Sequence, residues 1–156
     1  MAAVKIGEAA PEFELAGTGG RCYRLLDYRG RGVILAFYPG DFTTVCTRQF
    51  CSYRDAADRL DELDADVVGV SPQSLDSHER FRAKYGLTVP LLADPERTAI
   101  RAYGVLGPGG IVRRPIFIVD PEGIVRYRQV ALLGLGYQDV EDLKRSLRRA
   151  RAEAVS

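Results

Sequence analysis

The sequence predicts an α/β fold in which helices flank a central mixed β-sheet. Residues 33–38, Val-Ile-Leu-Ala-Phe-Tyr, form a continuous apolar run, which is typical of a central strand covered on both faces. From about Thr44 the apolar residues recur every three or four positions, as in a helix, and a second apolar run follows at 67–70. Strand, helix and strand in this order indicate a parallel β-α-β unit.

The first half of the chain predicts an early strand and a long first helix. Residues 21–25 alternate in polarity and predict an early strand, which we expect to belong to an N-terminal β-hairpin extension of the sheet. The first helix is expected to begin near Thr44 and to continue until Asp64 and Ala65 lead into the next strand. Its apolar positions are Phe50, Tyr53, Ala57, Leu60 and Leu63.

Two further helices are expected in the middle of the chain. One spans 77–85, with Phe81 and Tyr85 facing inward and Gly86 as its stop signal. The other begins at Pro95, a residue that suits the first helical position, and ends at residues 103–104.

The last part of the chain predicts a hairpin and a helix. Residues 116–120 form an apolar strand, 120–123 (Asp-Pro-Glu-Gly) suit a type I turn, and 124–130 alternate like a returning strand. This order of elements, with a cysteine just past the first core strand, points to a thioredoxin-like sheet that is parallel in its first half and closed by an antiparallel hairpin. The inward face of the final helix carries Val140, Leu143, Leu147 and Ala150.

Composition limits the classes of function. The 156 residues suffice for one domain with a sizeable core, and we expect a single domain over 1–156. Lys and Arg number 22 against 21 Asp and Glu. A net charge of +1 does not indicate binding to nucleic acid or to an anionic membrane surface. No apolar run approaches a membrane span and the first residues lack an apolar signal region, so we expect a cytoplasmic protein.

Cysteine usage draws attention to one position. Three cysteines are too few for the disulfide framework of a secreted domain, and each is by default a small buried hydrophobe. Cys22, in the early strand, keeps that reading as a packed or idle thiol. Cys46 follows the buried strand and a Pro-Gly loop, and falls in the first turn of a helix that Thr43 or Thr44 can cap. A helix start favours a thiolate, because free N–H groups and the helix dipole stabilise negative sulfur.

The stretch 37–51 is similar to the active-site loop of peroxiredoxins, whose pattern is Pro-x-x-x-Thr-x-x-Cys. Pro39, Thr43 and Cys46 fill that pattern, and Cys51, five residues on, resembles the second cysteine of the bacterioferritin comigratory protein (PrxQ) subfamily. Further fragments fall in the family's order, namely 69–71 (Gly-Val-Ser), 77–81 (Ser-His-x-x-Phe), 90–94 (Pro-Leu-Leu-Ala-Asp), 103–105 (Tyr-Gly-Val) and Arg114 before 117–120 (Phe-Ile-Val-Asp).

The resemblance implies a thiol peroxidase of the atypical 2-Cys type, which acts on hydrogen peroxide and organic hydroperoxides. Cys46 would be the peroxidatic cysteine, Thr43 would orient the peroxide, Arg114 would stabilise negative charge and Pro39 would shield the sulfur from water. Cys51 would resolve the sulfenic acid as a disulfide. No metal, haem or flavin is implied. The expected partners are the peroxide and an external dithiol such as thioredoxin, and the chain is expected to be a monomer or a weak homodimer.

The spacing of the two cysteines carries a physical consequence. Five residues of a regular helix place two Cα atoms about 8–9 Å apart. A disulfide needs them within about 7 Å. If Cys46 and Cys51 share one helix when reduced, residues 44–52 must unwind before the bond forms, and this region should have low local stability.

Three positions depart from the family pattern. Val45 stands where Gly is common, and Gln49 stands where Glu is usual, which weakens an expected carboxylate contact to the active-site arginines. Pro115 follows Arg114 where the family usually has Ser or a similar small residue, which is then followed by Thr. Because thioredoxins carry a cis-proline at this edge of the site, the sequence suggests a cis Arg114–Pro115 bond, against a general preference for trans.

Two other classes of function remain as alternatives. A thiol–disulfide oxidoreductase or redox-sensing switch would use the same cysteine pair on protein partners, although C-x-x-C is the usual spacing for that chemistry. A metal-binding module would use Cys46, Cys51 and either His78 or Cys22, but a second closely spaced ligand pair is lacking. We assign no chemistry to His78 or to Arg113.

Overall fold

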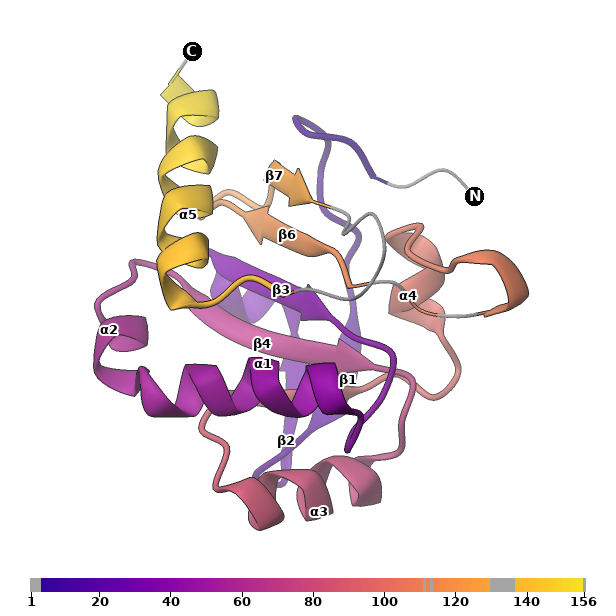
Figure 1. The fold of residues 1–156 in the computed structure, drawn as a ribbon. Coiled ribbons are helices and arrows are strands. Elements are labelled where there is room, and N and C mark those ends of the chain that lie inside the picture. Colours follow the sequence, from indigo (N-terminus) through magenta and orange to yellow (C-terminus); the bar gives the residue numbers. More distant parts are fainter. Residues whose placement is uncertain (1–3, 111, 113, 130–136, 156) are drawn as a thin grey trace.

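The computed structural model describes residues 4–110, 112, 114–129 and 137–155. Within these residues a seven-stranded sheet runs in the order β2-β1-β5-β4-β3-β6-β7 (Figure 1). The strands are β1 (Glu14–Gly17), β2 (Arg21–Arg24), β3 (Val33–Phe37), β4 (Asp66–Ser71), β5 (Leu91–Ala93), β6 (Ile116–Val119) and β7 (Val125–Gln129).

The pairing of the strands confirms the predicted mixed sheet. β3, β4 and β5 pair in parallel, and β6 and β7 add an antiparallel hairpin on the other side of β3. β1 and β2 form the N-terminal hairpin, which joins the sheet where Gly17 pairs with Leu92 of β5. β5 is absent from the predicted elements, because three residues are too few to show a period.

The helices lie close to the predicted positions, with three differences. They are α1 (Thr44–Asp55), α2 (Ala57–Asp61), α3 (Leu75–Tyr85), α4 (Thr98–Ala102) and α5 (Val140–Val155), with 3-10 turns η1 (Leu25–Tyr28) and η2 (Pro108–Gly110). The single helix expected over 44–63 is broken at Ala56, whose φ of −110° and ψ of 28° are not helical.

The starts of α3 and α4 are set by side chains that accept backbone hydrogen bonds. α3 begins two residues before the predicted start, because the Ser74 hydroxyl accepts from the Ser77 N–H at 3.1 Å. α4 begins at Thr98 and not at Pro95. The Asp94 carboxylate accepts the N–H groups of Thr98 and Ile100 at 2.9 and 2.8 Å and so defines the first turn.

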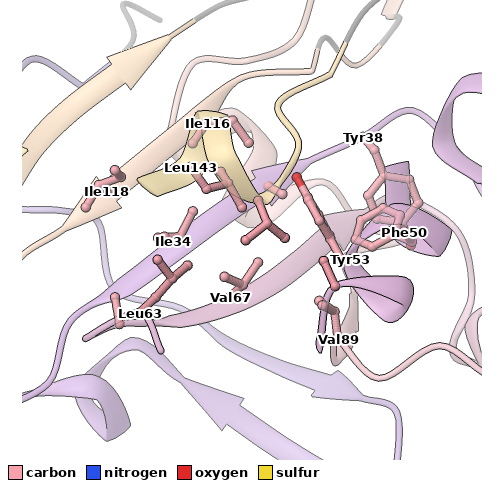
Figure 2. Close-up of a cluster of buried hydrophobic side chains, with 14 of the residues drawn as sticks. Ile34, Tyr38, Phe50, Tyr53, Leu63, Val67, Val89, Ile116, Ile118 and Leu143 are labelled. Carbon is pink, nitrogen blue, oxygen red and sulfur yellow. The ribbon is translucent and has the colours of Figure 1, made fainter. Parts of the chain in front are cut away.

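Alternate residues of β3 face two separate cores, as expected for a central strand. Ile34 and Ala36 face the side on which α1, α3 and α5 pack, whereas Val33, Leu35 and Phe37 face the side covered by α4 and the N-terminal segment. Figure 1 shows α1 and α5 in front of the central strands, and Figure 2 shows the apolar side chains that fill the space beneath them.

The C-terminal hairpin has the predicted turn. The Gly123 N–H donates to the Asp120 carbonyl at 2.9 Å, and the Asp120 carboxylate accepts from the N–H groups of Glu122 and Ile124. The predicted end of the returning strand at Val130 lies outside the described residues, as does Arg113.

The predicted cis bond between Arg114 and Pro115 is wrong. Among the described residues no peptide bond is cis, and this one is trans. The Pro115 carbonyl accepts the Phe37 N–H at 3.2 Å, so the residue extends the pairing of β6 with β3. None of the described helices is both long and apolar enough to cross a membrane.

A glycine lets α1 lie close to the sheet. A Cβ atom on Gly69 of β4 would stand 2.7 Å from the Cζ atom of Phe50, which is nearer than van der Waals contact allows. Phe50 is almost fully buried and lies one turn after Cys46 on α1. The absent side chain therefore sets the height of this helix, and of its first turn, above β4.

We expect Gly69→Ala to lower the free energy of unfolding by about 1–3 kcal/mol, because Phe50 must move out of a packed core. Urea unfolding followed by circular dichroism measures the change. Gly40→Ala is the control, since a Cβ there meets the Gln73 side chain at an ordinary 3.5 Å. An equal loss in the two variants would contradict this account of the packing.

Candidate active site

Cys46 lies in the first turn of α1, directly after the end of β3 and a short loop. Its side chain is fully buried. Thr43 caps the helix with extended backbone (φ −74°, ψ 152°), and its hydroxyl oxygen accepts the Cys46 N–H at 3.4 Å. The same hydroxyl donates to the Gly40 carbonyl at 3.3 Å. Thr43, and not Thr44, is thus the cap, and its oxygen lies beside the backbone of the cysteine.

Arg114 approaches the sulfur from a distant part of the chain. Its Nη1 donates to Cys46 Sγ at 2.9 Å, across 68 positions of sequence. The residue stands two positions before β6, whose antiparallel pairing with β3 carries it to the end of that strand. A guanidinium and a helix start both stabilise negative charge, so both features can stabilise negative charge that develops on the Cys46 sulfur.

Gln49 replaces the expected carboxylate with a neutral amide inside the protein. Its Nε2 donates to the Tyr53 hydroxyl at 3.1 Å, and that hydroxyl donates to the Gln138 carbonyl at 2.6 Å. Burial raises the pKa of Tyr53, so its phenol keeps the proton that it donates. The Oε1 atom of Gln49 has no protein partner among the described residues. Gln49 and Arg114 both line a cavity of about 560 Å³ between α1, β6 and α5.

The other two residues of the family pattern lie on the same stretch of chain. Cys51 is partly buried, packs against the core beside Phe50, and shares α1 with Cys46. All three cysteines of the chain are free thiols. Pro39 is partly buried at the beginning of the loop that leads from β3 to the helix.

The loop contains a backbone conformation that costs energy. Phe42 has a φ of 62°, in the left-handed region that residues with a Cβ rarely adopt, at a cost of about 1–2 kcal/mol. Its side chain is 44% exposed, and its ring lies 5.1 Å from that of Phe81 on α3. Such a residue in the loop before Cys46 indicates that its surroundings hold the loop in place.

The structure does not support a metal-binding module, with or without Cys22. Cys22 is exposed on the edge strand β2, and its thiol lies 3.5 Å from the Glu14 carboxylate. In the described part of the chain no three His, Cys, Asp or Glu side chains are grouped so that they could hold a metal ion.

Sequence reasoning missed a buried polar group under the loop, formed by Tyr38, Asp41 and His78. The one signal for it was the position of Asp41, an acid four residues after the end of a fully buried strand. A single histidine on a polar helix gave no sign that it would be fully buried.

Comparison with known proteins gives a consistent result. Residues 6–128 match the family model described as the AhpC/TSA family. Peroxiredoxin Bcp of Bacillus subtilis is 38% identical over 136 residues, which cover 81% of this chain and 87% of that protein. The chloroplastic peroxiredoxin Q of Oryza sativa subsp. japonica is 36% identical over 126 residues, covering 80% of this chain and 58% of the relative.

A solved structure agrees over most of both chains. The bacterioferritin comigratory protein of Xanthomonas campestris superposes with a TM-score of 0.76 at 26% identity, covering 91% of this chain and 92% of the other. The thioredoxin-like fold and the predicted resemblance are therefore confirmed. The chain belongs to the AhpC/TSA family and is a peroxiredoxin, a thiol-dependent peroxidase similar to the Bcp and peroxiredoxin Q proteins.

Proposed function

We propose that Cys46 is the peroxidatic cysteine, and that the chain reduces hydrogen peroxide and organic hydroperoxides through it. The observation that carries this proposal is the contact of Arg114 Nη1 with Cys46 Sγ at 2.9 Å, in the first turn of a helix. A cation and a helix start that act on one sulfur stabilise the negative charge that a nucleophilic sulfur carries.

The first step transfers one oxygen atom to sulfur. The Cys46 thiolate attacks the terminal oxygen of the peroxide, an S–O bond forms and the O–O bond breaks. The sulfur is oxidised to sulfenic acid, and the leaving oxygen takes up a proton to become water or an alcohol. Arg114 stabilises the charge that develops on the leaving oxygen, the Thr43 hydroxyl orients the peroxide, and Pro39 limits the access of water.

The second step uses Cys51. Its thiol condenses with the sulfenic acid, which forms the Cys46–Cys51 disulfide and releases water. Both residues lie on α1, where five positions separate their Cα atoms by about 8–9 Å. The start of the helix must therefore unwind before the sulfurs can bond. An external dithiol, such as thioredoxin, then reduces the disulfide and is itself oxidised.

The burial of Cys46 favours a small substrate over a protein partner. A sulfur with no exposed surface is less accessible to a bulky protein disulfide than to a small peroxide. The Xanthomonas campestris protein has alkyl peroxide reduction activity, which supports organic hydroperoxides as substrates here. A cytoplasmic location and a monomer or weak homodimer remain part of this proposal.

Substitution of the two cysteines separates the steps. We expect Cys46→Ser to abolish peroxide consumption, and Cys51→Ser to complete a single turnover that stops at sulfenic acid. Peroxide consumption measures the first effect, and mass spectrometry after trapping with dimedone measures the second. Cys22→Ser, which alters the exposed thiol of β2, should leave both readouts unchanged. An active Cys46→Ser variant would exclude the mechanism.

Arg114→Gln should slow peroxide reduction by about 10–100-fold, because a hydrogen bond to a charged group contributes about 1.5–3 kcal/mol. The second-order rate constant with hydrogen peroxide provides the measurement. Arg128→Gln, which removes an exposed guanidinium from β7, is the matched control and should have little effect. Similar losses in both variants would point to overall charge and not to the contact with sulfur.

Unwinding can be observed by hydrogen exchange. Amides of residues 46–52 should exchange much faster in the oxidised protein than in the reduced one, because the disulfide cannot form on an intact helix. Amides of α5 serve as the internal reference and should keep their protection in both states. Equal protection of 46–52 in the two states would refute the proposed route to the disulfide.

A further inference from the structure

The loop before Cys46 is tied to the interior by a carboxylate that has no role in the steps above. Asp41 is only 6% exposed. Its Oδ1 accepts from the Tyr38 hydroxyl at 2.8 Å, and its Oδ2 accepts from the Ser77 hydroxyl at 2.7 Å. The same Oδ2 lies 2.7 Å from Nδ1 of His78, which is fully buried. The carboxylate thus joins the end of β3 to the first turn of α3.

Donors and acceptors can be assigned within this group, in which the Tyr38 hydroxyl also lies 3.3 Å from His78 Nδ1. His78 Nε2 lies 3.1 Å from the Leu92 carbonyl, which can only accept, so Nε2 carries a proton. Burial and then the Asp41 carboxylate raise the pKa of Tyr38 well above its usual range, so its hydroxyl also remains a donor. One proton must therefore lie between His78 Nδ1 and Asp41 Oδ2. Each polar side-chain atom of Tyr38, Asp41 and His78 then has a hydrogen-bond partner. The bond to the Leu92 carbonyl also connects the group to β5.

The residue that follows this anchor is Phe42, with its left-handed backbone. The next residue is Thr43, whose two hydrogen bonds, to the Gly40 carbonyl and from the Cys46 N–H, are long at 3.3 and 3.4 Å. Bonds of this length hold a hydroxyl weakly. The position of the Thr43 oxygen therefore depends on the backbone of the loop and on whatever keeps Phe42 in its unusual conformation.

We propose that Asp41 and His78 are positioning residues for the reaction at Cys46. By holding the loop against α3 and β5 they keep Phe42 left-handed, and this places the Thr43 hydroxyl where the peroxide binds. The inference rests on the peroxidatic role of Cys46. It adds that the reaction depends on a buried, proton-sharing pair that touches neither the sulfur nor the substrate.

A double-mutant cycle tests whether Asp41 acts through Thr43. The readout is the second-order rate constant with hydrogen peroxide, measured by competition with a haem peroxidase. Asp41→Ala should slow the reaction at least about tenfold, because small displacements of a reacting geometry are costly. In a Thr43→Val background the same change should cost less than about twofold, since no hydroxyl remains to be positioned. If the rate losses of Asp41→Ala and Thr43→Val multiply in the double variant, the two residues act independently and the proposal is overturned.

Glycine at position 42 tests the conformational step. In the Asp41→Ala background, Phe42→Gly should react at least about threefold faster than Phe42→Ala, because glycine adopts the left-handed region without a steric penalty. Both changes remove the same aromatic contacts with α3. Equal rates in the two variants would overturn the proposal.

Milder variants keep the test decisive if Asp41→Ala does not fold, as judged by circular dichroism. Ser77→Ala removes one hydrogen bond to Asp41 and should slow the reaction about threefold, with the loss again absent in the Thr43→Val background. Asp41→Asn can satisfy Tyr38, Ser77 and His78 and should stay within about twofold of the unaltered chain. A loss in Ser77→Ala that persists without the Thr43 hydroxyl would overturn the proposal.

Two controls separate this inference from the proposed function. Asp76→Ala removes an exposed carboxylate from the same helix as Ser77 and should react at the unaltered rate. Peroxide consumption by Cys46→Ser would defeat the proposed function itself. A normal rate in the unaltered chain, together with multiplicative losses in the cycle, would defeat only the role of Asp41 and His78.

Discussion

The antiparallel pairing of β6 with β3 is the constraint on which the site depends. Its register matches Ala36 with Ile116, so the residue two positions before β6 reaches the end of β3, where the chain turns into α1. Arg114 and Cys46 meet there because two strands from distant parts of the sequence share hydrogen bonds. The trans bond before Pro115 preserves this pairing, since the Pro115 carbonyl accepts from Phe37.

Local signals were sufficient to predict most of the fold. The apolar run of β3, the Asp-Pro-Glu-Gly turn and the inward face of α5 each reflect a short-range rule of backbone or periodicity. β5 and the break at Ala56 were not predictable in this way. Three residues show no period, and the break carries neither Gly nor Pro. The start of α4 depends on the Asp94 carboxylate, whose bonds to the helix only the folded chain reveals.

The candidate site was predictable where it follows the chain or, as for Arg114, the family pattern, and not where it depends on tertiary packing alone. Thr43 and Cys46 stand three positions apart at a helix start, so their proximity is local. The polar group under the loop brings together the buried residues 38, 41 and 78, and the half-buried Ser77 donates to it from the first turn of α3. A sequence pattern reports residue types and spacing, but not which polar side chains the fold will enclose.

The break at Ala56 determines how much of α1 remains if its start unwinds. It limits α1 to 12 residues, a length of about 18 Å, although the Ala56 N–H still donates to the Ser52 carbonyl at 3.1 Å. Unwinding of residues 44–52 would also move Phe50, which packs on Gly69 of β4, so the change would reach the packing of the helix on that strand. Because α1 ends at Asp55, such unwinding would leave only residues 53–55 of this helix in place.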